Sequence, residues 1–176
     1  MTLSNESVMA MVRDGQVEQL AILFERYHVR VFNFLLRMTG DRILSEDLTQ
    51  EVFFRMLKYR HTYRESRTFT TWMFQIARNV NLDYLRKNHP EMAADDAPEP
   101  VARTVDPSDD MEKRENVVRL RQALARLPWK KRELLVLSRY HDLRYQEIAD
   151  MLDCSVSAIK VGVHRALEDL RRMLWT

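Results

Sequence analysis

The chain has 176 residues, of which 45% are hydrophobic and 31% charged, and its formal net charge at pH 7 is +2. With only 3 Gly and 5 Pro, and almost no strand-like alternation, the composition predicts an all-helical protein. No apolar run is long enough to cross a bilayer and no signal peptide is visible, so we expect no membrane insertion. The single cysteine excludes an internal disulfide and agrees with a cytoplasmic protein.

The small net charge hides a strong division along the chain. Residues 1–87 carry a net charge of +3, residues 88–112 carry −7, and residues 113–176 carry +6. Four of the five prolines fall in residues 89–110, a stretch without a helical apolar stripe. Because prolines reject helix and carboxylates repel one another, we expect two domains, 1–88 and 113–176, joined by a flexible acidic linker at 89–112.

Apolar residues at helical spacing predict four helices in the first domain. The expected helices run from Ser4 to about Arg13, from Val17 to Thr39, from Ser45 to Lys58 and from Thr70 to Lys87. Gly15 and Gly40 follow the first two, at the position where a helix end favours glycine. The first domain is therefore expected to be a helical bundle.

A basic and aromatic segment precedes the fourth helix and continues along it. Aromatic side chains stack on unpaired bases, arginines hold the nucleic-acid backbone, and Asn can pair with a base edge. In the alternative interpretation, Phe69 and Trp72 are core residues and the arginines form a solvated rim. The segment comprises Tyr59, Tyr63, Phe69 and Trp72, interleaved with Arg60, Arg64 and Arg67 and continued by Arg78, Asn79, Asn81, Arg86 and Lys87.

The second domain ends in a helix-turn-helix pattern. Helices are expected at 110–126 and 130–140, separated at Pro128, followed by a short helix from Tyr145 and a longer one after the N-cap residue Ser155. Apolar residues at spacings of three and four give each of the last two helices one buried face. The polar and basic residues opposite that face suit a DNA major groove, and they are Ser157, Lys160, His164 and Arg165.

The sequence gives little support for an enzyme. Glu25 and His28 have the spacing of half a di-iron site, but the second half is missing, and Asp47 and Glu51 lack a basic or nucleophilic partner. The glycines form no phosphate-binding loop and no Cys–His cluster could hold zinc, so we expect no cofactor and no metal. Cys154, in the turn, is expected to be a small buried residue, with a redox role as the alternative.

Two blocks of the sequence resemble the extracytoplasmic-function (ECF) sigma factors of bacterial RNA polymerase. Residues 48–53 (Leu-Thr-Gln-Glu-Val-Phe) and 69–86 (from Phe-Thr-Thr-Trp-Met-Phe to Tyr-Leu-Arg) are similar to region 2 of that family. Residues 124–128 (Leu-Ala-Arg-Leu-Pro) through Arg165 and Ala166 are similar to region 4. The resemblance spans about 17–87 and 117–172, and it implies a transcription initiation factor that is not an enzyme.

The family resemblance also implies partners and a role for particular residues. Region 2 would dock on core RNA polymerase and then open and hold the −10 element of promoter DNA, while region 4 would read the −35 element as duplex. An anti-sigma factor would hold the protein inactive, and the linker would pass near the active centre along the path of the nascent RNA. The implied docking residues are Asp47, Gln50, Glu51, Phe54 and Arg55. The implied −10 residues are Tyr63, Arg64, Arg67, Phe69, Trp72, Arg78, Asn79 and Arg86, and the implied −35 residues are Ser155, Ser157, Lys160, Val161, His164 and Arg165.

The last helix departs from the family pattern at three positions. Val161, Gly162 and Leu167 stand where the family usually has small polar or basic residues. Three interpretations stay open: fewer −35 contacts with the backbone brought close by Gly162, an apolar contact of Val161 with a thymine methyl, or a contact of Leu167 with a partner protein.

Two other functions remain as alternatives. A stand-alone helix-turn-helix regulator, acting as a dimer without polymerase, would explain residues 145–172 but leave the block at 48–86 without a purpose. It also requires a dimerisation surface, and no heptad pattern suggests one. The alternative from another class is a metal-dependent helical enzyme built on Glu25, His28, Asp47 and Glu51.

Overall fold

A computed structural model describes residues 3–90 and 111–175, with the backbone alone for 111–114. These residues form helices and contain no β-strand, as the composition predicts. Most of the expected linker at 89–112, namely residues 91–110, lies outside the described residues. The elements are α1 (Asn5–Arg13), η1 (Val17–Gln19), α2 (Leu20–Thr39), α3 (Arg42–Lys58), η2 (Arg60–Thr62), α4 (Phe69–Asn88), α5 (Met111–Arg126), α6 (Trp129–Leu135), η3 (Val136–Tyr140), α7 (Tyr145–Leu152) and α8 (Val156–Trp175).

Short polar caps explain where the helices of the N-terminal bundle (residues 3–90) begin and end. The Ser4 hydroxyl accepts a hydrogen bond from the amide of Ser7 and starts α1. Gly40 has a left-handed φ of 69° and ends α2, as the sequence predicts. The predicted start of α3 at Ser45 is wrong by three residues, because Asp41 caps the helix by accepting from the amide of Leu44.

The N-terminal bundle has an aromatic core between α2 and α4. Phe34 and Phe74 are fully buried and meet edge to face, with 5.5 Å between ring centroids. Tyr27 and Phe69 make a similar contact at 5.1 Å nearer the start of α4. Fully buried aliphatic and Met side chains complete the core around them: Leu23, Val31, Leu35, Val52, Met56 and Met73.

The C-terminal domain (residues 111–175) is organised around α6. Arg132 of α6 is 1% exposed, and its guanidinium donates to the carbonyl groups of Leu124 and Leu127 that end α5. These bonds satisfy carbonyls that a helix end leaves unpaired. The single helix predicted over 130–140 is α-helical only to Leu135 and continues as a π-helical turn to Tyr140.

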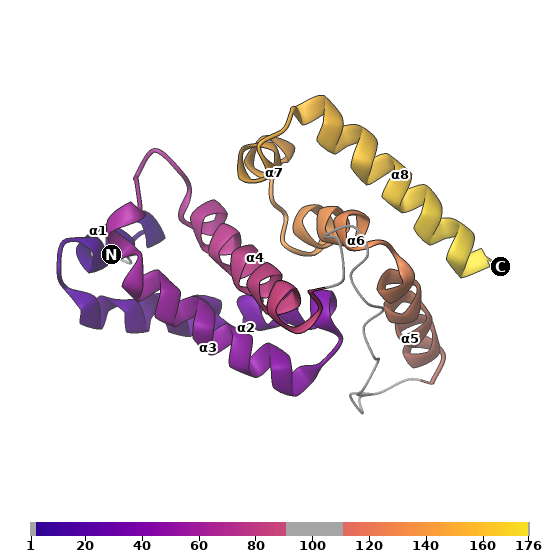
Figure 1. The fold of residues 1–176 in the computed structure, drawn as a ribbon, viewed down its shortest axis with the longest axis horizontal. Coiled ribbons are helices and arrows are strands. Elements are labelled where there is room, and N and C mark those ends of the chain that lie inside the picture. The colour runs from indigo at the N-terminus through magenta and orange to yellow at the C-terminus, as the bar shows by residue number, and fades with distance from the viewer. Residues whose placement is uncertain (1–2, 91–110, 176) are drawn as a thin grey trace.

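The two units pack against each other along α2 and α4 (Figure 1). Figure 1 shows α4 running beside α6 and α7, while α8 lies on the outer side of the C-terminal domain. Helix α2 also contacts α5, α6 and η3. The arrangement therefore leaves α8 free of the N-terminal bundle and places α4 at the interface.

Candidate nucleic-acid and polymerase interfaces

The polar side of α8 is open to solvent. The residues expected to read duplex DNA are all exposed; we call them the reader face, and they are Ser155, Ser157, Lys160, Val161, His164 and Arg165. Ser155 caps α8 by accepting from the amide of Ala158 at 3.1 Å, as predicted. His164 lies 3.4 Å from the carboxylate of Glu168 one turn further on. The N-terminal half of α8 thus presents hydroxyl, cationic and apolar groups together.

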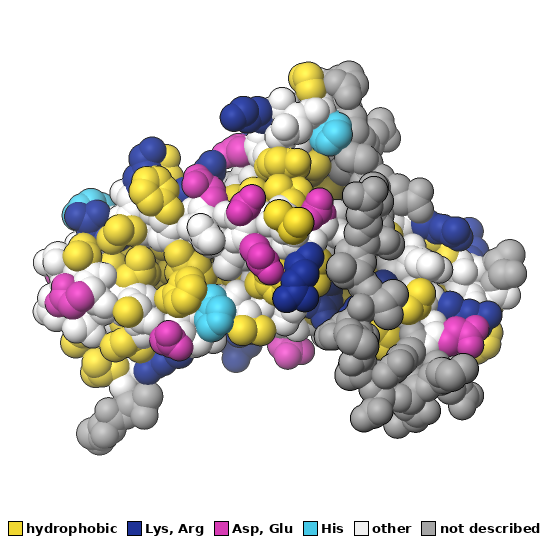
Figure 2. All heavy atoms as spheres, turned by 90° about the horizontal axis from the view of Figure 1, so that it is seen from below, with side chains coloured by type: hydrophobic (Ala, Val, Ile, Leu, Met, Phe, Trp, Pro, Cys, Tyr) yellow, Lys and Arg dark blue, Asp and Glu magenta, His cyan; other side chains and the backbone are white. Residues whose placement is uncertain are grey.

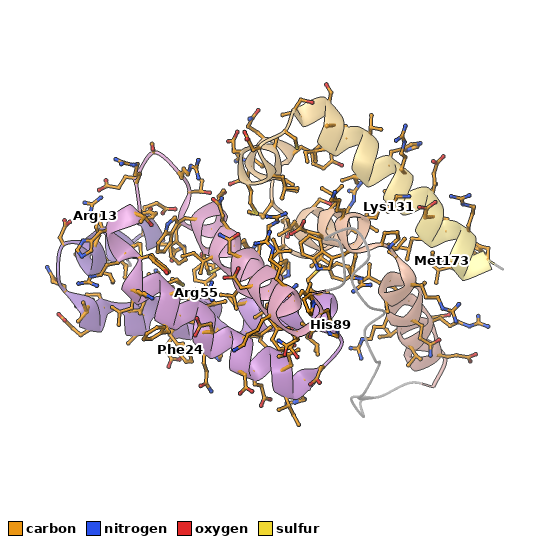
Figure 3. All side chains as sticks on the ribbon, viewed as in Figure 1. Arg13, Phe24, Arg55, His89, Lys131 and Met173 are labelled. Atoms are coloured by element: carbon orange, nitrogen blue, oxygen red, sulfur yellow. The ribbon has the colours of Figure 1, made fainter. Side chains whose placement is uncertain are left out.

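The opposite side of α8 is fixed against α6. Ile159, Val163 and Ala166 are buried there, as the apolar spacing predicts. Lys131 of α6 pairs with Asp169 of α8, and Figure 3 shows Lys131 between the two helices. The hydrogen bond from Lys131 is the largest cause of a pKa of Asp169 below its ordinary value. The reader face is therefore carried by a helix that the domain core holds in place.

Gly162 and Leu167 take part in the packing of the C-terminal domain. A Cβ atom built on Gly162 would lie 2.6 Å from Cδ1 of Leu134 in α6, so glycine allows α6 and α8 to approach closely. Leu167 packs against the core of the domain. Of the three unusual residues, only Val161 lies on the open side, with 48% of its surface exposed. This favours the interpretation in which Val161 contacts a base.

The turn between α7 and α8 differs from the sequence prediction at one residue. Asp153 adopts a left-handed conformation with φ of 52° and ends α7. Cys154 follows it and is exposed, so the prediction that its side chain is buried is wrong. The small core below the turn is filled by Ile148 and Ala149 instead.

Of the aromatic residues in the segment before and within α4, Tyr63, Phe69 and Trp72 are core residues in this structure, whereas Tyr59 is 44% exposed. Tyr63 is 1% exposed, Phe69 0% and Trp72 7%. Tyr63 and Trp72 meet edge to face at 5.3 Å, and burial raises the pKa of Tyr63 to about 12. Rings in these positions cannot stack on bases as expected, because the helices of the bundle bury them. The alternative interpretation, that they anchor the core, agrees with the structure.

The remaining side chains expected to touch the −10 element fall into two groups. Arg64, Arg67, Asn79 and Arg86 are exposed. Arg67 donates to the side chain of Gln75 at 3.2 Å. Arg78 is different, because its Nε lies 2.7 Å from a carboxylate oxygen of Glu133 in α6.

The exposed side of α3 carries the residues expected to dock on polymerase. This docking face consists of Asp47, Gln50, Glu51, Phe54 and Arg55. Phe54 is 59% exposed. Arg55 pairs with Glu51 at 2.7 Å and with Asp83 of α4 at 2.6 Å, and Figure 3 shows it between α3 and α4. The face thus combines an exposed aromatic ring with fixed and free carboxylates.

The view from below shows hydrophobic side chains gathered over the N-terminal bundle, interrupted by single acidic and basic groups (Figure 2). Exposed apolar residues of α2 and α3 include Phe24, Val29, Ile43 and Phe54. A patch of this kind marks a protein-binding surface more often than a nucleic-acid one.

Sequence reasoning missed the buried polar residues between the two units. Glu133 lies in a run of charged residues that is typical of a solvated helix, yet its side chain is only 2% exposed. Burial raises the pKa of Glu133 to about 7, although the guanidinium of Arg78 opposes that rise. Burial, reinforced by the charges of Arg30 and Arg37, lowers the pKa of His141 to about 3. No periodicity along one helix could reveal these residues, because their partners belong to the other unit.

The alternative enzyme centre does not assemble in the structure. His28 lies 2.8 Å from the carbonyl oxygen of Phe24 and stacks on the Phe24 ring. Within the described ranges, His, Cys, Asp and Glu side chains do not gather in groups of three or more that could hold a metal ion. Among residues 3–90 and 111–175, none of the helices has the length and apolar character that a membrane crossing requires.

The fold and the open helix-turn-helix define a two-unit, all-helical DNA-binding protein, and comparison with known proteins narrows the class. Residues 23–90 match the family Sigma-70 region 2, and residues 118–170 match Sigma-70, region 4. The chain is 33% identical over 165 residues to the RNA polymerase sigma factor CarQ of Myxococcus xanthus, covering 92% of each chain. It is 32% identical over 154 residues to the ECF RNA polymerase sigma factor SigM of Bacillus subtilis, covering 86% of this chain and 92% of the relative.

Solved structures agree on the fold. CnrH, solved with the cytosolic domain of CnrY, superposes with a TM-score of 0.73 at 20% identity over 97% of this chain and 96% of that one. The sigma factor RpoE of Bartonella quintana, solved with the anti-sigma factor NepR, gives 0.70 at 20% identity over 89% and 96%. The chain belongs to the ECF family of RNA polymerase sigma factors, which are transcription initiation factors that direct polymerase to specific promoters. The comparisons therefore support a sigma factor over the alternative of a stand-alone helix-turn-helix regulator.

Proposed function

We propose that this sigma factor uses three separate surfaces: the docking face of α3 for core RNA polymerase, the loop and exposed side of α4 for the −10 element, and the reader face of α8 for the −35 element. The division of labour follows the domain boundaries that we propose, 1–88, 89–112 and 113–176. The observation that carries the proposal is that one chain presents an open helix-turn-helix and, on a separate unit, a basic helix with an exposed Asn79.

The reader face suits duplex DNA. Lys160 and Arg165 supply positive charge, and Val161 between them offers an apolar surface to a thymine methyl. The N-terminal residues of a recognition helix contact base edges, and all six residues of this face lie in or before the first half of α8. Because α6 fixes α8 through buried contacts, the face is rigid before DNA arrives.

The −10 surface suits a melted strand held by its backbone. Arg64, Arg67 and Arg86 are exposed cations that can neutralise phosphates, and Asn79 can bind the edge of a captured base. We assign Tyr63, Phe69 and Trp72 to positioning, since their burial fixes the loop from which Arg64 and Arg67 extend. Arg78 joins this surface when its ion pair with Glu133 is broken.

The docking face suits a basic and apolar surface on the polymerase. Asp47 and Gln50 are exposed, and Phe54 provides an apolar anchor at the centre of the face. The ion pairs of Arg55 with Glu51 and Asp83 hold α3 and α4 together, so docking and −10 reading share one rigid element.

The remaining assignments follow from these three surfaces. The chain acts in the cytoplasm, where polymerase and DNA are found, and has no catalytic activity of its own. An anti-sigma factor, as in the solved RpoE–NepR complex, controls it by covering one or more of the surfaces. The linker, with its negative charge, passes along the path of the nascent RNA and is displaced by RNA of the same sign.

In-vitro transcription with core polymerase on a genomic fragment library tests the proposal. We expect transcripts whose starts share −35 and −10 sequences. The variant Asp47→Ala with Glu51→Ala is expected to lose core binding in a pull-down, whereas the control Glu18→Ala with Glu25→Ala, which removes two exposed carboxylates on η1 and α2, keeps it. Equal binding by both variants would contradict the docking assignment.

A further inference from the structure

The loop 63–68, which joins η2 to α4, lies beside the short first helix of the chain. Helix α1 contacts both η2 and α4, and Figure 3 shows Arg13, the last residue of α1, at the end of the bundle where this loop lies. Nη2 of Arg13 is 3.2 Å from Oε1 of Glu65, in the middle of the loop. This ion pair joins the end of α1 to a segment more than 50 positions further along the chain.

A second contact from α1 fixes the point where the loop becomes α4. Oε1 of Glu6 accepts a hydrogen bond of 3.1 Å from the backbone amide of Phe69, the first residue of α4. The first amides of a helix have no acceptor within the helix itself. The hydroxyl of Thr68 serves the amide of Thr71, so Glu6 supplies from another helix the acceptor that the first amide needs.

Helix α1 is itself anchored in the core of the N-terminal bundle. Val8, Met9 and Val12 are fully buried. The side-chain amide of Asn5 donates to the hydroxyl of Tyr27 in α2 at 2.6 Å. Because one side of α1 is packed in the core, Glu6 and Arg13 extend from a fixed support, and their contacts restrain the loop 63–68 instead of moving with it.

The restrained loop presents the cations that we assign to the −10 strand. The ring of Tyr63 is buried at the start of the loop, whereas Arg64 and Arg67 are exposed. Burial is the largest cause of the raised pKa of Tyr63, and the charges of Glu6 and Glu65 add to it, so both carboxylates lie near this ring. The loop is thus held at its start, its middle and its end, and its two arginines extend between these points.

We propose that α1 sets the conformation of the loop 63–68 for the −10 strand, with Glu6 and Arg13 as positioning residues that do not touch DNA. The inference rests on the proposed −10 role of this loop. Ordering a loop on binding costs free energy, and a loop that is ordered beforehand avoids that cost and favours one base sequence over another. An exposed ion pair contributes little to the stability of the whole fold, so the effect of Arg13 belongs to the loop.

The test measures promoter opening by the holoenzyme, on the promoter identified by transcription and on the same promoter with one −10 base substituted. The ratio of the two opening rates reports base discrimination. Glu6→Ala removes the acceptor of the Phe69 amide and is expected to lower this ratio by about fivefold, whereas Glu6→Gln keeps an acceptor oxygen and stays within about twofold of the unmodified chain. A purely structural defect lowers both rates equally and leaves the ratio unchanged.

A double-mutant cycle tests the ion pair. Arg13→Ala and Glu65→Ala are each expected to lower the ratio by about threefold, and the double variant is expected to lose no more than either one. Arg42→Ala is the matched control, because it breaks an exposed ion pair of similar length, 3.3 Å to Glu46, that lies within α3 alone. The ratio should not change in this control, and additive losses at Arg13 and Glu65 would contradict the pairing.

One further variant separates failure of the inference from failure of the proposed function. Arg64→Ala with Arg67→Ala removes the two exposed cations of the loop and is expected to slow opening on both promoters. Normal opening by this variant would overturn the −10 role of the loop, and the role of α1 with it. Slow opening by this variant, with an unchanged ratio in Glu6→Ala and Arg13→Ala, would overturn the role of α1 alone.

Discussion

The two helices that we assign to DNA, α8 and α4, differ in what the rest of the chain does to them. On α8 all six residues of the reader face are exposed, and the core of the C-terminal domain holds only the opposite side. On α4 Phe69 and Trp72 are buried and Arg78 is paired across the interface, whereas Asn79 and Arg86 are exposed. The surface that we propose for the −35 element is therefore fully exposed in the free chain, and the surface that we propose for the −10 element is only partly exposed.

The difference follows from where each helix lies. Helix α8 is at the edge of its domain, so solvent covers one whole side of it. Helix α4 contacts α2 and α3 of its own bundle and α7 of the other domain. A helix with packed neighbours on several sides has fewer positions left for binding, and those positions can be regulated by moving one neighbour away.

The largest expected effect is on the free energy of unfolding, and it separates aromatic residues that form the core from residues that we expect to contact DNA. Phe69→Ala is expected to lower the free energy of unfolding by about 3–5 kcal/mol, because it removes a fully buried ring from the core. Val161→Ala, on the exposed side of α8, is expected to change it by less than about 0.5 kcal/mol. Urea denaturation followed by circular dichroism measures both. A stable Phe69→Ala variant that fails only in promoter opening would show that the ring is a base-stacking surface.

The next effect concerns the reader face. Lys160→Ala and Arg165→Ala are each expected to weaken binding of −35 duplex to the holoenzyme by about 1–3 kcal/mol, and loss of a phosphate contact lowers the salt slope by about one. Arg171→Ala removes an equal charge from the exposed C-terminal end of the same helix and serves as the control. Fluorescence anisotropy across a salt series gives both quantities. Equal losses in all three variants would mean that α8 contributes only general charge.

A smaller effect is expected at Asn79, the exposed polar residue beside Arg78. Asn79→Ala is expected to reduce promoter opening by about tenfold, because a bidentate contact to one base contributes roughly 1–3 kcal/mol. Closed-complex formation should stay within about twofold, since duplex binding relies on phosphate contacts. Permanganate footprinting measures opening and a gel shift measures binding. Parallel losses in both assays would assign Asn79 to structure.

The smallest expected effect is the response of the closed arrangement to pH. The pKa of Glu133 is raised from 4.5 to about 7, so its contribution to closure is full below 4.5 and is lost as pH rises through 7. The pKa of His141 is lowered from 6.5 to about 3, so its contribution is present above 6.5 and is lost as pH falls towards 3. Arg78 and Lys130 face Glu133, and Arg30 and Arg37 face His141.

Between pH 4.5 and 6.5 the protonation of Glu133 and the protonation of His141 therefore affect the packing of the two units in opposite directions. The fraction of molecules with packed units should change little in this range for the unmodified chain. Glu133→Gln leaves the His141 response alone, so closure weakens as pH falls. His141→Gln leaves the Glu133 response, so closure strengthens as pH falls. Distance measurements between the units across this range check both signs, and identical profiles for the two variants would contradict the assignment.

The sequence predicted the helices and the reader face because both depend on short-range order. Spacings of three and four placed Ile159, Val163 and Ala166 on the buried side of α8, and the reader face followed as its complement. Glycine and serine marked ends that depend on local backbone geometry, as at Gly40 and Ser155.

Properties that depend on distant partners were not predictable in the same way. The sequence around Tyr63 and Trp72 looks the same whether their rings face a base or the core. Only the packing of α1–α4 decides which of the two they face. The interface of Glu133 and His141 joins residues more than 50 positions apart, as the Arg78–Glu133 bond shows. The close contact at Gly162 is with the Cδ1 atom of Leu134, a residue of another helix, and does not depend on the backbone angle of Gly162.

The distance between the two units in the free and polymerase-bound chain tests the account most directly. Spin labels on the exposed native Cys154 and on an introduced Glu25→Cys report this distance by pulsed electron resonance. We expect one narrow, short distance in the free chain and a clearly longer one after core polymerase is added. A broad, long distribution in the free chain, or no change on polymerase binding, would contradict it.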